Sequence, residues 1–140
     1  MREADLIPII CTLFFGGDVE PRIPVTIHAA QSHVVPDCVT ATSAIEIGLD
    51  RRSSLDSLQQ TLFAAEMTGK APMIVLVDSD GEEGVYEYRI ETAARRAGVA
   101  YVVIDLELLR RWQMTAPFRA AREQILSGGG RDGPSAPAGG

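Results

Sequence analysis

The sequence is poor in the features that mark several large classes of protein. No apolar run approaches the ~20 residues that a membrane-spanning helix requires. Basic residues are in the minority: 13 Lys and Arg stand against 19 Asp and Glu, which gives a net charge of −6. The chain therefore lacks the excess of basic residues found in proteins that bind nucleic acid over a broad surface. A local basic patch is still compatible with this net charge. Lysine is nearly absent, with Lys70 as the only one.

Only two cysteines are present, and they form none of the common metal or redox motifs. Cys11 and Cys38 lie far apart in the chain, there is no Cys-x-x-Cys pair, and His28 and His33 do not complete a zinc-finger spacing. In an exported protein a Cys11–Cys38 disulfide is the natural pairing, whereas in a cytosolic protein both residues are ordinary buried thiols.

The N-terminal apolar stretch resembles a signal-peptide core in length only. Leu6 to Phe15 is long enough, but Arg2 is outweighed by Glu3 and Asp5, so the positive n-region of an export signal is missing. We interpret the stretch as a buried first segment and expect a cytoplasmic protein, with export as the alternative if the two cysteines are disulfide-bonded.

The motifs of nucleotide-binding and serine-hydrolase folds are also missing. No Gly-x-Gly-x-x-Gly follows a strand, no phosphate-binding loop exists and no serine lies in a Gly-x-Ser-x-Gly context. Residues 127–140 are almost entirely Gly, Ser, Ala and Pro, a composition typical of a disordered tail. Residues 1–126 remain as one predicted domain, and 46% hydrophobic residues suffice for its core.

Hydrophobic periodicity predicts helices and strands that alternate in the second half of the chain. We expect helices at 3–15, 53–68, 85–97 and 106–126, the last one kinked or split at Pro117, and strands at 23–29, 33–40, 44–49, 72–77 and 101–104. Alternation demands parallel pairing there, and we place 34–40, 44–49, 73–78 and 100–105 in one sheet. The predicted fold is an α/β three-layer sandwich with a mixed central sheet.

Two carboxylates lie where neighbouring predicted strands can bring them together. Asp37 ends one strand and Glu46 lies in the middle of the next. Carboxylate oxygens with water are the usual ligands of Mg2+, which can activate water and stabilise phosphoryl transfer. The alternative is that Asp37 is a turn residue and Glu46 faces solvent on a half-exposed strand.

The ordered set of residues around this pair resembles the PD-(D/E)XK nuclease superfamily. The resemblance rests on Pro36-Asp37, Ile45-Glu46-Ile47 and a helix that carries Gln59-Gln60. Within that superfamily, the sequence is most similar to a group of small, mostly uncharacterised bacterial members. The residues that carry this similarity are the run from Asp37 to Glu46, then Gln60 and Thr68-Gly69-Lys70, and upstream Cys11, Gly16-Gly17 and Glu20. The similarity covers roughly residues 11 to 105.

The resemblance implies a restriction-endonuclease-like α-β-β-β-α-β core and a metal-dependent nuclease acting on DNA or RNA. Asp37 and Glu46 would bind Mg2+ or Mn2+, Gln60 would contact the metal site or the substrate, and Glu20 would be an accessory carboxylate.

The sequence departs from the superfamily pattern at one position that matters for catalysis. The expected lysine, two residues after the glutamate, is Gly48. Arg51 and Arg52 are the candidates to replace it at the site, but arginine is a poor proton acceptor at neutral pH. Loss of the lysine removes electrostatic stabilisation of the negative charge that develops during the reaction. The alternatives are therefore a weak or inactive nuclease, or a non-catalytic protein-interaction or structural domain that keeps the fold.

A second acidic stretch directly follows the buried strand at 72–77. Asp78-Ser79-Asp80-Gly81 after a strand suggests a toprim-like metal-binding phosphotransfer site, with Glu46 as its distant glutamate. Only one helix fits between Glu46 and Asp78, whereas toprim domains place a further strand–helix unit there. We therefore prefer a solvated loop, in which Asp and Gly suit a turn.

Overall fold

The structure is a computed structural model that describes residues 2–50 and 55–128. The chain divides into two compact units, with the boundary between Leu106 and Glu107. The first unit holds every strand in the described part of the chain. The predicted N-cap residues Ser53 and Ser54 lie outside the described residues, as does 129–140 of the predicted tail.

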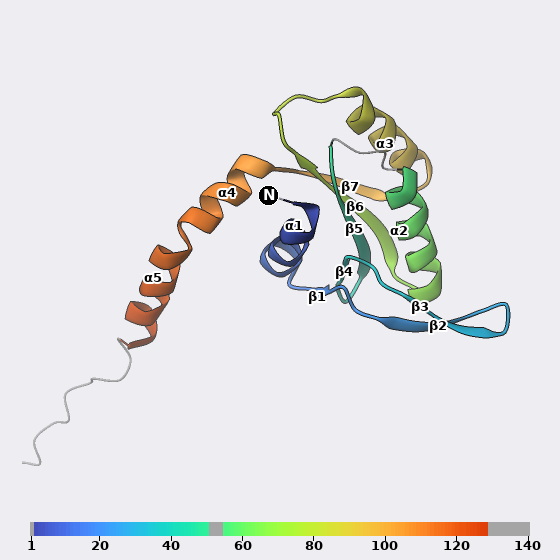
Figure 1. The fold of residues 1–140 in the computed structure, drawn as a ribbon, viewed down its shortest axis with the longest axis horizontal. Coiled ribbons are helices and arrows are strands. Elements are labelled where there is room, and N and C mark those ends of the chain that lie inside the picture. The colour runs from blue at the N-terminus through green and yellow to red at the C-terminus, as the bar shows by residue number, and fades with distance from the viewer. Residues whose placement is uncertain (1, 51–54, 129–140) are drawn as a thin grey trace, which may run out of the picture. The chain divides into compact units, whose positions relative to one another are not determined.

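A mixed five-stranded sheet forms the centre of the first unit, in the order β1-β4-β5-β6-β7 (Figure 1). The neighbours β1–β4 and β4–β5 pair antiparallel, and β5–β6 and β6–β7 pair parallel. The five strands are β1 (Asp18–Val19), β4 (Cys38–Val39), β5 (Ser43–Leu49), β6 (Ala71–Asp78) and β7 (Ala100–Asp105). The predicted mixed α/β architecture is confirmed, and the parallel half arises from the alternation of strands and helices.

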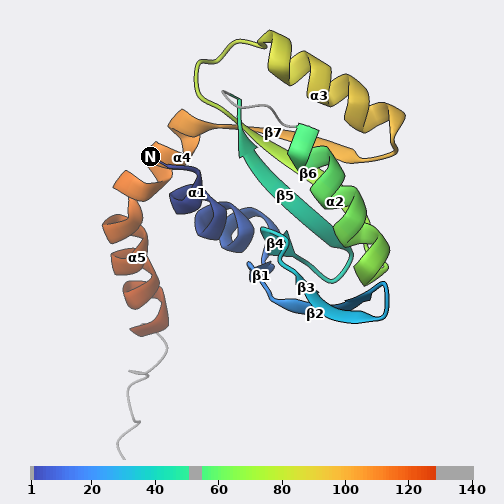
Figure 2. The same ribbon diagram turned by 45° about the vertical axis from the view of Figure 1, so that its right-hand side comes forward.

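Helices cover both faces of this sheet (Figures 1 and 2). On one face lie the two crossover helices, α2 (Leu55–Thr68) and α3 (Val85–Arg96). The other face carries α1 (Glu3–Ile10), which continues into a turn of π-helix, η1 (Cys11–Phe15). The crossovers β5-α2-β6 and β6-α3-β7 put α2 and α3 side by side, because consecutive connections of one hand fall on one face.

The core lies between the sheet and its helices. On the α2–α3 face, one buried cluster joins β6 and α3, with members Ile74, Leu76, Ile90, Ala94 and Val99. Because strand side chains alternate, Ile45 and Ile47 of β5 are on the face opposite Glu46, and both are buried. On this opposite face α1 contributes fully buried Leu6 and Ile10.

A disulfide joins the N-terminal helix to the sheet. Cys11 and Cys38 are bonded, with 5.5 Å between their Cα atoms, and both are fully buried. This is the pairing that the sequence predicts for oxidising conditions. Gly17 lies against the bond, where an added Cβ would be 2.8 Å from the Cys38 sulfur and 2.8 Å from the Val39 carbonyl oxygen. A larger residue than glycine would therefore push β4 away from η1.

A two-stranded hairpin stands apart from the main sheet and corrects two of the predicted boundaries. It consists of β2 (Ile23–Ile27) and β3 (Ala30–Val34). The predicted strand 33–40 is wrong as a single element, because Pro36 removes a backbone donor and the chain changes sheet between Val34 and Cys38. The turn also lies earlier than the gap between the predicted strands 23–29 and 33–40: it is at His28-Ala29, whose φ angles are 48° and 62°.

The strand β7 is partly exposed although its sequence is apolar. Val102 is 37% exposed and Val103 is 49% exposed. The cause is position: β7 pairs with β6 alone and forms an edge of the sheet.

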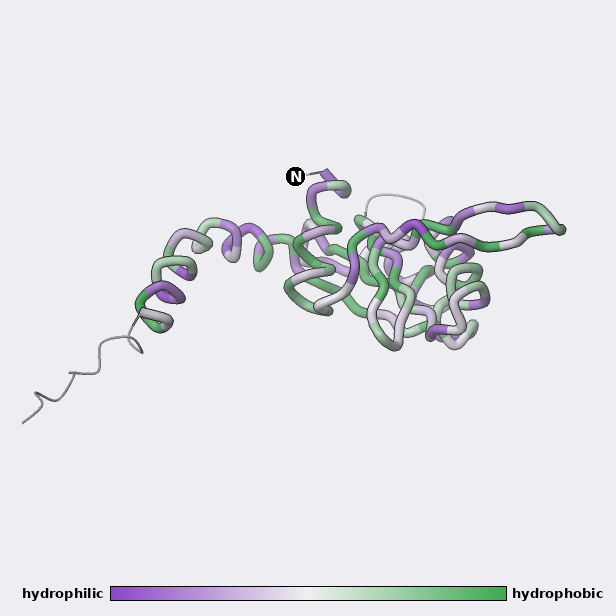
Figure 3. The backbone as a smooth tube through the Cα atoms, turned by 90° about the horizontal axis from the view of Figure 1, so that it is seen from below, coloured by the Kyte–Doolittle hydropathy of each residue, from purple (hydrophilic) through white to green (hydrophobic). Residues whose placement is uncertain are grey.

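The second unit is helical and begins after Leu106. Its helices are α4, which runs from Leu106 to Met114, and α5 (Ala116–Gly128), so the predicted break near Pro117 is confirmed. The Arg119 guanidinium carbon lies 3.5 Å from the ring centre of Trp112 and links the two helices. Figure 3 shows polar and apolar residues interleaved along α4, α5 and the β2–β3 hairpin. In the described residues, none of the helices has the length and apolar character needed to cross a bilayer.

Candidate functional site

A pocket of about 360 Å³ opens between α2, β5 and the segment that leaves the β2–β3 hairpin. Its lining comprises His33, Val34, Val35, Asp37, Glu46, Gln59, Gln60 and Phe63. Three residues proposed from the sequence, Asp37, Glu46 and Gln60, are therefore brought to one cavity. His33 also lines this cavity, although it is not among the site residues predicted from the sequence.

Strand pairing places the two carboxylates side by side. In the β4–β5 ladder Cys38 is opposite Ile45, so Asp37, one residue earlier, falls opposite Glu46. The Asp37 Oδ2 accepts a hydrogen bond of 2.8 Å from the backbone N–H of Ile47. The backbone N–H of Asp37 in turn donates a hydrogen bond to the carboxyl group of Glu46, and the two carboxyl groups share a hydrogen bond.

Burial and mutual repulsion keep a proton on this pair. Glu46 is only 6% exposed. Desolvation, followed by the charge of Asp37, raises the pKa of Glu46 to about 9. Desolvation also raises the pKa of Asp37, although the hydrogen bonds from Ile47 and Glu46 oppose it. Near neutral pH the two carboxyl groups therefore share one proton and one negative charge, as a coupled pair.

The third predicted residue, Gln60, is held in place by its buried neighbour. The Thr61 hydroxyl donates to the carbonyl oxygens of Ala44 and Met73 at 3.1 Å, and it accepts from the Met73 N–H at 3.1 Å. These contacts fasten α2 to both β5 and β6. Gln60 and Gln59 are exposed on the adjoining part of α2 and line the pocket.

The position where the superfamily has lysine is open. Gly48 does not have a positive φ, and the β5–β6 ladder runs without interruption from Ser43 to Leu49, so no bulge requires glycine. An added Cβ would meet only the Ser57 hydroxyl oxygen at 3.6 Å, an ordinary contact. The backbone of β5 therefore accepts a larger residue here.

The other residues proposed for the site lie elsewhere. Glu20 is exposed and does not line the pocket, but its backbone N–H donates to the Asp37 carbonyl oxygen at 3.0 Å, and its charge helps to raise the pKa of Asp37. Arg51 and Arg52 are outside the described residues. The single lysine, Lys70, donates its Nζ hydrogen to the carbonyl oxygen of Thr40 and is not among the pocket residues.

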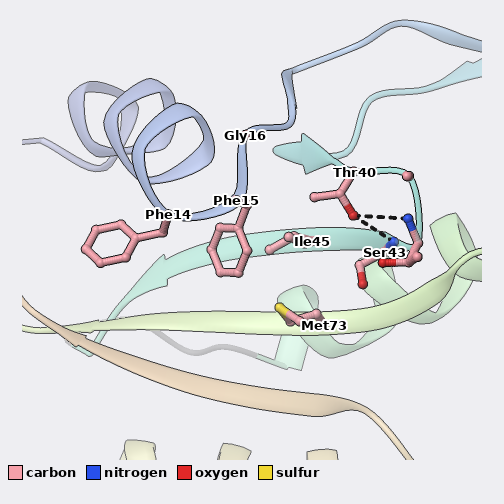
Figure 4. Close-up of a pocket in the computed structure, with 9 residues that line it drawn as sticks. Phe14, Phe15, Gly16, Thr40, Ser43, Ile45 and Met73 are labelled. Carbon is pink, nitrogen blue, oxygen red and sulfur yellow. Dashed lines mark hydrogen bonds between the residues drawn. The ribbon is translucent and has the colours of Figure 1, made fainter.

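A second cavity of about 420 Å³ has a different character (Figure 4). Phe15 of η1 lies beside Ile45 there, and Met73 lines the same cavity on the sheet face opposite Glu46, whereas the Phe14 ring points away from both. The Thr40 hydroxyl oxygen accepts from the Ser43 N–H at 2.9 Å and closes one end of the cavity. None of its lining residues is acidic, basic or histidine, so it offers no acid–base or metal chemistry.

A second group of carboxylates gathers beyond the carboxyl ends of β5 and β6. One ligand atom from each of Asp50, Asp78, Asp80 and Glu87 lies within 4.8 Å of the others. Glu46 is not in this group, so the glutamate that the toprim alternative needs lies elsewhere. Asp50 and Glu87 were not predicted. The signal for Asp50 is its place directly after a strand that runs parallel to the one ending at Asp78.

Local donors surround this second group. Asp50 accepts from the Ser79 N–H and hydroxyl at 2.8 Å, and Asp78 Oδ1 accepts from the N–H groups of Asp80 and Gly81 at 3.1 and 3.0 Å. Desolvation, then the charges of Asp78, Asp50 and Asp80, raise the pKa of Glu87 to about 7. These hydrogen bonds build the loop between β6 and α3.

No known family model, curated protein or solved structure matches this chain. Its function is therefore inferred from the geometry of the Asp37–Glu46 pocket.

Proposed function

We propose that the chain is a divalent-metal-dependent phosphodiesterase that acts on nucleic acid, with its site in the Asp37–Glu46 pocket. The observation that carries the proposal is the pairing of these two carboxylates across adjacent strands, in a pocket that Gln60 also lines. The proposal includes membership of the PD-(D/E)XK superfamily and its restriction-endonuclease-like core. The order of α1, β4, β5, α2 and β6 along the chain supports that membership.

The donor set fits Mg2+ or Mn2+. Two carboxyl groups within hydrogen-bonding reach of each other supply the hard oxygen ligands that these ions prefer, and the amides of Gln59 and Gln60 line the same pocket. Asp37 and Glu46 would hold the ion. The proton that the pair retains near neutral pH marks a place where positive charge is favourable, and a metal would replace it.

A bound ion supplies a water of lowered pKa and neutralises charge on a phosphate oxygen. The chain's own residues orient the site. The Ile47 N–H fixes one Asp37 oxygen, and Thr61 fixes the helix that carries Gln60. Gln60 can then donate through its amide to a phosphate oxygen of the substrate while its own oxygen faces the ion or water.

The direct test is a nuclease assay with Mg2+ and Mn2+ on single- and double-stranded DNA and RNA. We expect metal-dependent cleavage by the wild-type chain and none by Glu46→Ala. Because Ala removes a buried proton-bearing group, Glu46→Gln serves as the isosteric control for folding. Isothermal titration with Mn2+ should show binding to the wild-type chain that both variants lose.

Two results would overturn the proposal. Cleavage that persists in Glu46→Gln would place the chemistry elsewhere. A well-folded wild-type chain that binds Mn2+ but cleaves none of the four substrates would favour the non-catalytic alternative, which the missing lysine at Gly48 supports.

A further inference from the structure

The pocket contains little that can stabilise a phosphodiester. Of its lining residues, Asp37 and Glu46 are acids, and His33 alone can bear a positive charge. A phosphodiester brings a further negative charge, and this charge grows on the phosphate oxygens during attack. Gln60 offers an amide donor but no charge, so substrate binding calls for a source of positive charge beyond the metal.

Arg22 reaches the pocket through His33. Its Nη2 lies 3.3 Å from the Nδ1 of His33, and the two residues sit at the base of the β2–β3 hairpin, where Pro24 pairs with His33. A guanidinium carries only donors, so Nδ1 accepts in this contact and Nε2 carries the ring hydrogen. The contact thus fixes both the tautomer of the imidazole and a positive charge beside it.

The surroundings of the pair favour an anionic ligand. Residues 21–36 contain no Asp or Glu, in a chain that has 19 of them. Arg22 and His33 are both exposed, and no carboxylate forms a salt bridge with either in the described residues. A phosphate could therefore reach them without displacing a competing carboxylate.

We infer that Arg22 and His33 form the phosphate-binding element of this pocket and supply the positive charge that the chain lacks at Gly48. His33 donates through Nε2–H to a non-bridging oxygen of the scissile phosphate. Arg22 is a positioning residue, which holds the imidazole and adds its charge at the rim. This inference rests on the proposed function.

Two amide substitutions test the donor directly. In His33→Gln the amide nitrogen can take the place of Nε2, whereas in His33→Asn it takes the place of Nδ1. We expect His33→Ala and His33→Asn to lower kcat on the order of 10²-fold, as the loss of one transition-state donor does. His33→Gln should restore most of that loss. The matched control is His28→Gln, at the exposed tip of the same hairpin.

Arg22 is tested by the split between binding and turnover. Arg22→Gln should weaken substrate binding and lower kcat about tenfold, in the range found for partners that orient a reacting group. Arg22→Lys should keep binding but lose part of kcat, because lysine retains the charge without the fixed fork. Arg89→Gln, on the exposed side of α3, is the control for net charge.

Mn2+ titration separates this inference from the proposed function. All Arg22 and His33 variants should bind Mn2+ like the wild-type chain. Unchanged cleavage in His33→Ala, or equal kcat for His33→Asn and His33→Gln, would refute the inference and leave the metal site intact. A wild-type chain that neither binds Mn2+ nor cleaves would refute the proposed function itself.

Discussion

Two groups of carboxylates lie in different parts of the main sheet, one at the pairing of β4 and β5 and one beyond the ends of β5 and β6, and they are stabilised in different ways. Asp37 and Glu46 face each other across β4 and β5, and burial leaves them with a shared proton. Asp50, Asp78 and their neighbours sit beyond the strand ends, where the β6–α3 loop supplies backbone donors. Clustering of acids alone therefore does not distinguish a metal site from a loop.

The difference lies in what neutralises the charge. The loop group consists of Asp50, Asp78, Asp80 and Glu87. In it, Asp78 is partly exposed and Asp80 is exposed, and hydrogen bonds from adjacent residues stabilise the carboxylates. In the pocket group, Glu46 is desolvated, and its pKa rises to about 9, against about 7 for Glu87. A divalent cation that binds this buried pair has to displace the proton that the pair holds, so metal binding there releases a proton and strengthens as pH rises.

The largest expected effect comes from isosteric removal of one charge in each group. Asp37→Asn should lower metal-dependent cleavage on the order of 10³-fold, because it removes a charged ligand and the stabilisation of the transition state that depends on it. Asp78→Asn should leave cleavage within about twofold of the wild type, as expected for a residue outside the site. Cleavage rates under saturating Mn2+ measure both. A larger loss in Asp78→Asn would reverse the roles of the two groups.

The next effect concerns the missing cation. Gly48→Lys places an ammonium two residues from Glu46, on the same face of β5. The strand is regular there and the added Cβ has room beside Ser57, so we expect the variant to fold. Metal-dependent cleavage should rise on the order of 10²-fold, the size of effect that a positioned cation provides.

Gly48→Met is the control for this variant, because it adds similar length without charge. Thermal melting establishes that each variant is folded. A well-folded Gly48→Lys chain that binds Mn2+ and cleaves nothing would contradict the interpretation of this site as a nuclease weakened by the loss of its lysine. It would favour the alternative of a non-catalytic protein-interaction or structural domain.

The two groups affect the free energy of unfolding over different intervals of pH. A carboxyl group whose pKa is raised on folding binds protons more tightly in the folded state, so it favours folding at low pH and loses that contribution as pH rises. For Glu46 the loss extends from its ordinary value of 4.5 up to about 9, and for Glu87 it ends near 7. The slope for one such group approaches about 1.4 kcal/mol per pH unit.

Urea denaturation from pH 5 to pH 9 measures these slopes. The free energy of unfolding should keep falling between pH 7 and 9 in the wild-type chain, and Glu46→Gln should flatten that part of the curve. Glu87→Gln should change the slope below pH 7 only. A wild-type curve that is level above pH 7 would contradict a protonated Glu46.

The sequence allowed prediction of much of the fold because local signals decide it. Uninterrupted apolar runs gave β6, and helical periodicity with closing glycines gave α2 and α3. The hairpin was misassigned because its turn uses His28 and Ala29 at positive φ, where the residue types that usually signal such a turn are absent.

The candidate site was predictable as far as residue order reaches. Asp37 and Glu46 could be paired because neighbouring predicted strands carry them, and Gln60 was added by the resemblance to the PD-(D/E)XK superfamily. His33 could not, since it belongs to a hairpin outside the sheet and enters the pocket only through the path of the chain after Val34. Asp50 and Glu87 were missed because their grouping depends on where the β6–α3 loop turns.

The smallest expected effect is a pair of opposite changes at Asp78. Its Oδ1 accepts two backbone hydrogen bonds, from Asp80 and Gly81, while its charge lies near Asp50 and Glu87. Asp78→Ala loses both acceptor contacts and should lower the free energy of unfolding by about 1 kcal/mol. Asp78→Asn keeps the oxygen and removes the repulsion, and should raise it by a few tenths of a kcal/mol, the size typical of exposed charge pairs. Urea denaturation at pH 7.5 compares the two. If Asp78→Asn is also destabilising, the negative charge itself is needed there, and the loop group would have to be reconsidered as a site that a cation stabilises.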